Sequence, residues 1–253
     1  MGIYLVGNGG EAAMLRGMLL AMLLAAPAAA EEVDLELVLL ADATGSIDDA
    51  EIRLQREGYA AALLDPEVLW AIRNGGALGR VAVTYVEWAS AASQDVVVDW
   101  TVLAGEADAR AFGAALVAAP RRAFGSNAIG AALLRGLALI EGNGFEGGRR
   151  VIDLSADSAW NGSGPSIAAA RDVVLGADVV INGLAILCRG NCSGRPRAGN
   201  LEAEFAGQLI GGPGAFVVTA EDGPSFARAV RRKLILEIAD AAPEDGVAGV
   251  ERP

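Results

Sequence analysis

The stretch at residues 35–48, LELVLLADATGSID, constrains the fold of this chain more than any other part of the sequence. Its first seven residues are apolar except for one glutamate, which is typical of a strand buried on both faces of a parallel sheet. Asp42, Thr44 and Ser46 follow at alternate positions, and the acidic residues after them suit a helix N-terminus, where the backbone dipole favours negative charge. The stretch therefore predicts a strand, a polar loop and a helix. The loop falls at the carboxyl end of the strand, where ligands bind in open α/β sheets.

The oxygen-bearing side chains of this loop suggest a cation site. Asp42, Thr44 and Ser46 offer one carboxylate and two hydroxyls, a ligand set that suits a hard cation such as Mg²⁺ rather than zinc or copper. An ordinary capped turn after a strand uses the same residue types, and the pattern alone favours that simpler interpretation. Two later segments, at residues 125–127 and 157–158, lie at a helix start and a strand end and offer the further ligands that a cation site needs.

Predicted strands and helices alternate along the rest of the chain. After the first strand, apolar runs predict strands at residues 80–88, 95–101, 149–155, 178–187 and 215–219. Helical patterns lie between them, except that the second and third strands are close enough to pair as a hairpin. We therefore expect one α/β domain at residues 31–239, a doubly wound and mostly parallel six-stranded sheet with helices on both faces.

Charge and missing residue types exclude several functions. The formal net charge of −12 argues against nucleic acid, whose binding needs a basic face. The chain has no histidine, which excludes Ser-His-Asp and Cys-His catalysis and every metal site with a histidine ligand. Its one lysine, Lys233, lies with Arg228, Arg231 and Arg232 in a basic run that is typical of a solvated helix face.

The two ends of the chain are expected to lie outside the domain. Residues 14–30, MLRGMLLAMLLAAPAAA, have the layout of a secretory signal peptide, with translation starting at Met14 and cleavage after Ala30. We therefore expect a periplasmic or secreted bacterial protein with no membrane span in the mature chain. Residues 7–12 also match the dinucleotide-binding pattern G-x-G-x-x-A, but the signal peptide that follows leaves no room for the rest of that fold. The tail at 240–253, with two prolines and two glycines, is predicted to be disordered.

Cys188 and Cys192 are the only two cysteines, and they lie four positions apart in a polar loop. In an exported protein we expect them to form a local disulfide that closes a small ring. Two reactive thiols are the alternative. A metal site is disfavoured, because the chain has no histidine and no further cysteine.

The polar loops together resemble a known site. Asp42, Thr44 and Ser46 in the first loop, with Asp157 after a later strand, are similar to the metal-ion-dependent adhesion site (MIDAS) of the von Willebrand factor A superfamily. The resemblance covers residues 33–238 and implies the fold of that superfamily. The segments RLQREGYAAAL, AIGAAL, INGLAI, IGGPGAFVVTAED and FARAVRRKL are similar to a family of secreted bacterial A-type domains of unknown function.

The resemblance also implies the metal ligands. The first motif of the superfamily is D-x-S-x-S, so Thr44 replaces a serine and keeps its hydroxyl. The middle threonine of the superfamily falls at Asn127, whose carbonyl oxygen is an acceptable ligand for a hard ion, and Ser126 beside it offers a hydroxyl instead. Ser158 and Trp160 follow the later aspartate and are expected as further ligands or at the rim of the site. The predicted ion is Mg²⁺, with Mn²⁺ or Ca²⁺ as alternatives.

An ion held in this way implies a binding protein rather than an enzyme. In the superfamily one coordination position stays open for an acidic group, so the resemblance implies a protein partner that presents Asp or Glu. A metal-dependent phosphohydrolase is the alternative, because aspartyl phosphatases also use an aspartate at a strand end beside Mg²⁺. Those enzymes typically show D-x-D, whereas this chain has Thr44 at the second position. A scaffold of the same fold that binds no ion is the third interpretation.

Overall fold

The computed structural model describes residues 1–2, 30–187, 200–221 and 223–239. Contacts divide the chain into two units, residues 1–30 and 31–253, and every described helix and strand lies in the second unit. Nearly all of the predicted signal peptide, the predicted tail at 240–253, and both Cys188 and Cys192 lie outside the described residues.

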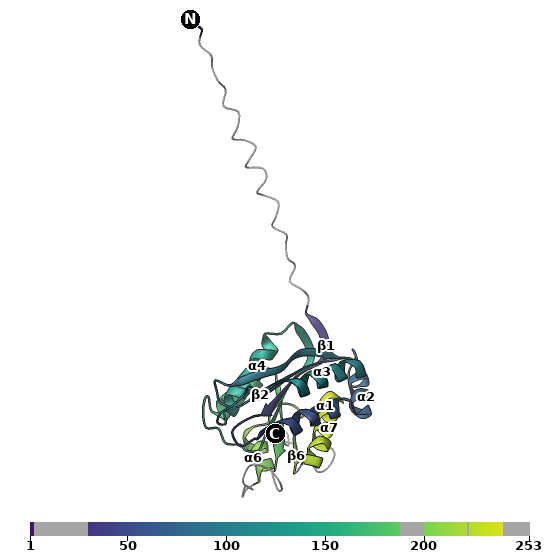
Figure 1. Ribbon diagram of the computed structural model, residues 1–253, viewed down its shortest axis with the longest axis vertical. Coiled ribbons are helices and arrows are strands. Elements are labelled where there is room, and N and C mark those ends of the chain that lie inside the picture. Colours follow the sequence, from purple (N-terminus) through teal and green to yellow (C-terminus); the bar gives the residue numbers. More distant parts are fainter. Residues whose placement is uncertain (3–29, 188–199, 222, 240–253) are drawn as a thin grey trace. The chain divides into compact units, whose positions relative to one another are not determined.

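The described strands form one six-stranded sheet in the order β3-β2-β1-β4-β5-β6 (Figure 1). All neighbouring strands are parallel except β2 and β3, which form an antiparallel pair. This arrangement confirms the expected mostly parallel sheet with a single hairpin. The strands are β1 (Glu31–Asp42), β2 (Val81–Trp88), β3 (Gln94–Leu103), β4 (Phe145–Ala156), β5 (Val180–Ile186) and β6 (Val217–Ala220).

The described helices alternate with the strands, as the sequence predicts. They are α1 (Asp49–Leu63), α2 (Pro66–Asn74), α3 (Glu106–Ala118), α4 (Ile129–Glu141), α5 (Ile167–Gly176), α6 (Leu201–Gln208) and α7 (Gly223–Ala239). Asp48 caps α1, since its carboxylate accepts hydrogen bonds from the backbone N–H groups of Ala50 and Glu51. None of the helices within the described residues is long and apolar enough to cross a membrane.

Two layers of helices cover the two faces of the sheet. Side chains of α1, α2, α3 and α7 share one core with Leu35, Leu37 and Leu39 of β1. Side chains of α4, α5 and α6 share the other core with Val38 and Leu40. Alternate side chains of β1 therefore enter two different cores, which explains why this strand is apolar at nearly every position.

β4 begins earlier than its sequence predicts. The glycine-rich residues 145–148 were expected in a loop, but they extend the strand and pair with the start of β1, where Phe145 lies opposite Glu31. The buried Glu36 stabilises this extension, because its Oε1 accepts a hydrogen bond of 2.8 Å from the backbone N–H of Gly147. A Cβ at Gly147 would lie 2.9 Å from the Glu36 side chain, so the strand needs glycine here.

One expectation for α7 is wrong. Arg228 and Arg232 are exposed, as a solvated helix face requires, but Lys233 is buried beside two carboxylates. Its Nζ lies 2.6 Å from Glu237 Oε1 and forms a second ion pair with Asp153 of β4. The basic residues of α7 lie partly on its solvent side and partly on its sheet side. Only the packing of α7 against the sheet shows that Lys233 is the one on the sheet side.

Candidate metal site

Asp42 is the last residue of β1, and the loop after it closes tightly at the edge of the sheet. Both Asp42 and Thr44 are fully buried. The Thr44 backbone N–H donates to Asp42 Oδ1 at 2.9 Å, and the Thr44 and Ser46 hydroxyl oxygens lie 3.1 Å apart. The backbone N–H of Gly45 donates to the Gly125 carbonyl at 2.9 Å, which ties this loop to the segment before α4. One carboxylate and two hydroxyls therefore lie together, as the D-x-T-x-S pattern predicts.

Asp157, which follows β4, lies beside Asp42. Burial and repulsion from the Asp157 carboxylate raise the pKa of Asp42 to about 7. The hydrogen bond from the Thr44 backbone N–H to Asp42 Oδ1 lowers that pKa only in part. The structure therefore brings the two aspartates to the same edge of the sheet, because the parallel strands β1 and β4 end side by side.

Two carboxylate oxygens at this edge have no donor. Among the described residues, Asp42 Oδ2 and Asp157 Oδ1 are buried and have no hydrogen-bond partner. Buried charged oxygens without donors are costly, and a bound cation removes that cost. Among the described residues, no three or more Asp, Glu, His or Cys side chains form a group that could bind a metal ion. A hard ion here would therefore need the two carboxylates together with neutral oxygens, and the Thr44 and Ser46 hydroxyls fit that need.

The other predicted ligands differ in their placement. Asn127 is largely buried and its Nδ2 donates to Ser158 Oγ at 2.9 Å, which leaves the amide oxygen as its remaining ligand atom. Ser158 is fully buried. Ser126 is exposed, and no hydrogen bond within the described residues joins it to either aspartate. Trp160 is 57% exposed on the loop after Asp157.

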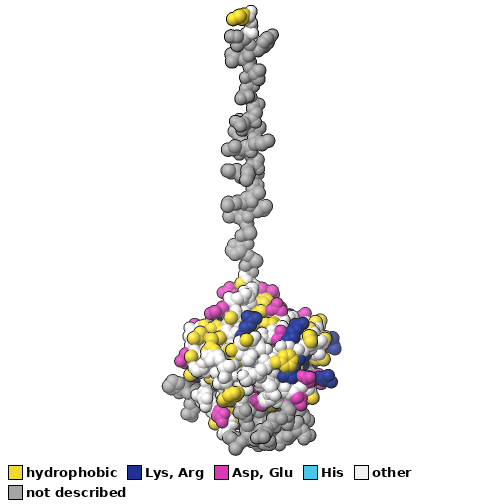
Figure 2. Space-filling view, turned by 60° about the vertical axis from the view of Figure 1, so that its left-hand side comes forward, with side chains coloured by type: hydrophobic (Ala, Val, Ile, Leu, Met, Phe, Trp, Pro, Cys, Tyr) yellow, Lys and Arg dark blue, Asp and Glu magenta, His cyan; other side chains and the backbone are white. Residues whose placement is uncertain are grey.

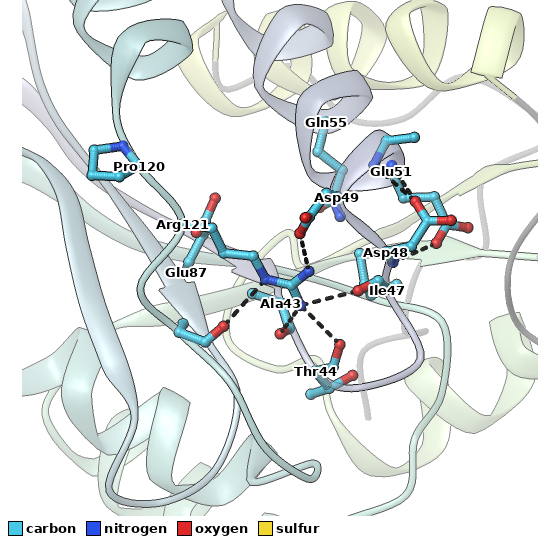
Figure 3. Close-up of polar contacts among 12 residues, drawn as sticks. Ala43, Thr44, Ile47, Asp48, Asp49, Glu51, Gln55, Glu87, Pro120 and Arg121 are labelled. Carbon is cyan, nitrogen blue, oxygen red and sulfur yellow. Dashed lines mark hydrogen bonds and ion pairs between the residues drawn. The ribbon is translucent and has the colours of Figure 1, made fainter.

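Arg121, which the sequence did not predict as a site residue, lies against the first loop and contacts its backbone (Figure 3). Its Nη2 donates to the carbonyl oxygens of Ala43 at 2.9 Å, Ile47 at 3.0 Å and Thr44 at 3.4 Å. Its Nη1 lies 2.8 Å from Asp49 Oδ1 at the start of α1. One guanidinium therefore fixes the backbone on both sides of the potential ligand hydroxyls. The pair of arginines directly after Pro120 was a weak signal for this role.

A second arginine supports the segment that carries Arg121. Arg56 of α1 is buried and its Nε lies 2.7 Å from Glu87 Oε1 of β2. Its guanidinium also donates to the carbonyl oxygens of Ala119 and Pro120. The neighbouring Gln55 donates to the Asp42 carbonyl at 3.1 Å. α1 therefore positions both the end of β1 and the start of the segment that carries Arg121.

Comparison with known proteins identifies the family. Residues 32–242 match the profile of a family described as "Protein of unknown function (DUF1194)". The chain belongs to this family. A search of curated proteins gave no match to this DUF1194 protein.

Solved structures similar in fold to this DUF1194 protein include a von Willebrand factor type A protein. They include the pilus adhesin SpaC from Lactobacillus rhamnosus GG, at 12% identity and a TM-score of 0.58, covering 82% of this chain and 31% of that one. A von Willebrand factor type A protein from Catenulispora acidiphila is 16% identical with a TM-score of 0.55, covering 82% and 43%. Proximal thread matrix protein 1 from the mussel byssus, solved with a zinc-occupied MIDAS motif, is 16% identical with a TM-score of 0.56, covering 83% and 46%.

These similarities confirm the predicted fold class, that of von Willebrand factor A domains. The DUF1194 chain spans less than half the length of each of the three structures. At such low identity they show a shared fold, and the activities of those proteins do not follow for this one.

Proposed function

We propose that this protein is an exported binding module that uses a divalent cation, Mg²⁺ in the first place, to recognise an acidic group on a protein partner. One observation carries the proposal: the buried oxygens Asp42 Oδ2 and Asp157 Oδ1 have no hydrogen-bond donor within the described residues. Two carboxylates about 4 Å apart repel by roughly 4 kcal/mol at an effective dielectric constant near 20. A cation turns that repulsion into attraction, whereas without a cation the repulsion is relieved only when Asp42 holds a proton.

The residues of the site divide into those that hold the ion and those that hold the loop. Asp42, Asp157 and the hydroxyls of Thr44 and Ser46 would hold the ion, with the Asn127 amide oxygen as a further ligand. When bound, the ion supplies a positive centre with an open position for a carboxylate. The zinc-occupied MIDAS of the mussel matrix protein supports a divalent ion in this fold. Adhesins and matrix proteins among the similar structures support binding as the function.

The surface charge also agrees with a protein partner rather than nucleic acid. Figure 2 shows acidic and basic side chains interspersed on one face, with hydrophobic side chains between them and no continuous basic area. The phosphohydrolase alternative would use a lysine near the site to balance the phosphate charge, but the only lysine is buried between Asp153 and Glu237. We therefore place the phosphohydrolase second.

Calorimetric titration with Mg²⁺ and Mn²⁺ tests the proposal. Wild-type protein should bind one ion, and Asp42→Ala should bind none. Asp172→Asn, which removes an exposed carboxylate on α5, serves as the matched control and should bind like wild type. Turnover of p-nitrophenyl phosphate that disappears in Asp42→Ala would favour the phosphohydrolase. An absence of ion binding by the wild-type protein would favour the metal-free scaffold.

A further inference from the structure

We propose that the partner is a polypeptide segment in which an Asp or Glu is flanked by aromatic or aliphatic side chains. Phe124 and Trp160, the aromatic rim, would receive those side chains while the ion receives the carboxylate. This inference rests on the proposed function, since it describes what surrounds the carboxylate at the same site.

The aromatic rim consists of two large side chains on two loops that also carry site residues. Phe124 comes three residues before Asn127 and is 56% exposed, and Trp160 comes three residues after Asp157 and is 57% exposed. The Gly162 backbone N–H donates to the Asn127 carbonyl at 2.8 Å, so the two loops are joined directly. Exposed aromatic side chains on loops that also carry candidate ligands are typical of a binding surface.

Both members of the aromatic rim are held in place on one side. The Arg121 guanidinium lies 4.9 Å from the centre of the Phe124 ring, and the Phe124 backbone N–H donates to Ser93 Oγ at 3.0 Å. The Trp160 ring packs over Gly162, where a Cβ would come within 2.4 Å of it. Aromatic groups that are already positioned lose little conformational entropy on binding, which is the property of residues that dominate an interface.

The charge of the protein shows why an acidic partner needs apolar contacts. The chain carries a formal net charge of −12, so an acidic segment is repelled as it approaches. The carboxylate–ion contact and the contacts with the aromatic rim must therefore supply the affinity at short range. A segment whose carboxylate has no apolar neighbours gains only the carboxylate–ion contact.

A polypeptide fits this surface better than an acidic sugar. Sugar hydroxyls need amide and carboxylate partners, but the nearby amides are already engaged by the loops. Asn161 accepts from the Gly130 backbone N–H through Oδ1 and donates to the Pro165 carbonyl through Nδ2, at 3.0 and 2.9 Å. The Asn127 amide nitrogen donates to Ser158. Apolar side chains need no such partners, and peptides present them next to a carboxylate.

Three blocked peptides test the inference in the presence of saturating Mn²⁺: acetyl-Phe-Glu-Phe-amide, acetyl-Ser-Glu-Ser-amide and acetyl-Phe-Gln-Phe-amide. Calorimetry should show the first binding roughly tenfold or more tightly than the second, because a tenfold difference is about 1.4 kcal/mol, less than a single aromatic hot spot contributes. The third should not bind, since it lacks a carboxylate. Equal binding of the first two peptides, or tighter binding of glucuronate than of the first peptide, would overturn the inference.

The variant Phe124→Ser with Trp160→Ser separates the aromatic rim from the ion site. Both side chains are exposed, so this double variant should fold, and its affinity for Mn²⁺ alone should stay within about twofold of wild type. Its affinity for the first peptide should fall by roughly tenfold or more. Trp70→Ser on α2, where the tryptophan is 64% exposed, is the matched control and should leave both affinities unchanged. If the double variant binds the peptide as tightly as wild type, the role of the aromatic rim is wrong and the proposed function still stands. If wild-type protein does not bind Mn²⁺, the proposed function is wrong as well.

Discussion

Asp42 makes the ion-free protein less stable as the pH rises. Its pKa is about 7 when folded, against an ordinary value of 3.8, so the folded state binds the extra proton between these two values. The stability that this proton provides is fully present below about pH 4 and is lost as the pH rises through 7, a loss of roughly 4 kcal/mol. Asp42→Asn should remove this loss.

Urea unfolding in EDTA at several pH values measures this loss of stability, as the difference in the free energy of unfolding between wild type and Asp42→Asn. The difference is the informative quantity because burial also raises the pKa of Glu237 to about 7, and both proteins share that contribution. Mg²⁺ should restore the stability of wild type above pH 7 and leave the variant unchanged. If the difference in unfolding free energy does not vary with pH, the fold does not raise the pKa of the Asp42 carboxylate.

Arg121 should act on the ion through the loop that it holds. Arg121→Ala removes three hydrogen bonds to loop carbonyls and the ion pair with Asp49, and hydrogen bonds from a charged group contribute roughly 1.5–3 kcal/mol each. We expect the affinity for Mn²⁺ to fall by roughly tenfold or more. Arg121→Lys should lower the affinity for Mn²⁺ less than Arg121→Ala does, because lysine keeps the positive charge although it lacks the planar guanidinium. Arg122→Ala, at the exposed neighbouring position, is the control. Equal Mn²⁺ affinity in wild type and Arg121→Ala would contradict this role.

Residue types reveal candidate ligands more readily than the groups that position them. Asp42, Thr44 and Ser46 were predictable because they follow a recognisable buried strand within five positions. Asp157 was predictable because parallel neighbouring strands end at the same edge. The partners of Arg121 are mostly backbone carbonyls more than seventy positions away. Every residue has a backbone carbonyl, so the residue types in the sequence do not indicate these contacts.

At the scale of the elements, α7 is joined to the sheet by a buried charge cluster of Lys233, Glu237 and Asp153. One lysine faces two carboxylates, and Asn182 of β5 also donates to Glu237 at 3.2 Å. Burial raises the pKa of both Asp153 and Glu237, against the effect of Lys233, which lowers them. The cluster thus joins α7 to β4 and β5, and when both carboxylates are ionised it carries one more negative charge than its single lysine neutralises.

Lys233→Met should therefore destabilise the protein by about 3–5 kcal/mol, because it leaves two buried carboxylates without a counter-charge. Glu237→Gln keeps an acceptor for Lys233 and Asn182 and removes the excess charge, so it should cost far less at pH 8. Arg232→Met, one position away and exposed, is the control for the loss of a positive charge on α7. Chemical denaturation at pH 8 measures all three, and a similar cost for Lys233→Met and Arg232→Met would contradict the cluster's role.

Element order was predictable, whereas one boundary and one helix face were not. The apolar periods of two and of three to four residues separate strands from helices along this chain, because each element buries a face in one of two cores. The start of β4 was missed because pairing with β1 and a hydrogen bond to Glu36 overcome the poor strand preference of glycine. The inward face of α7 was misjudged because a buried lysine is rare without the carboxylates that only the folded chain provides.

At the scale of the whole molecule, the start of the sheet bears on export. β1 begins at Glu31, whose backbone N–H donates to the Gly144 carbonyl at 2.9 Å, and the predicted cleavage falls just before it. Cleavage after Ala30 would therefore release a domain with its first strand complete. Expressed in a bacterium with an intact secretion pathway, the protein should be recovered from the periplasm or medium with Glu31 at its N-terminus, as N-terminal sequencing would show.

The residue directly before the cut is the one that a signal peptidase requires to be small. Ala30→Phe should therefore block processing and leave the precursor in the cells. Ala29→Phe changes the position whose side chain is least restricted in an A-x-A site, so it should be processed like wild type and serves as the matched control. Processing of both variants at the same bond would show that the apolar segment is not cleaved as a signal peptide. A mature N-terminus within β1 would remove residues that pair with β4, so such a product should also unfold more readily than one that begins at Glu31.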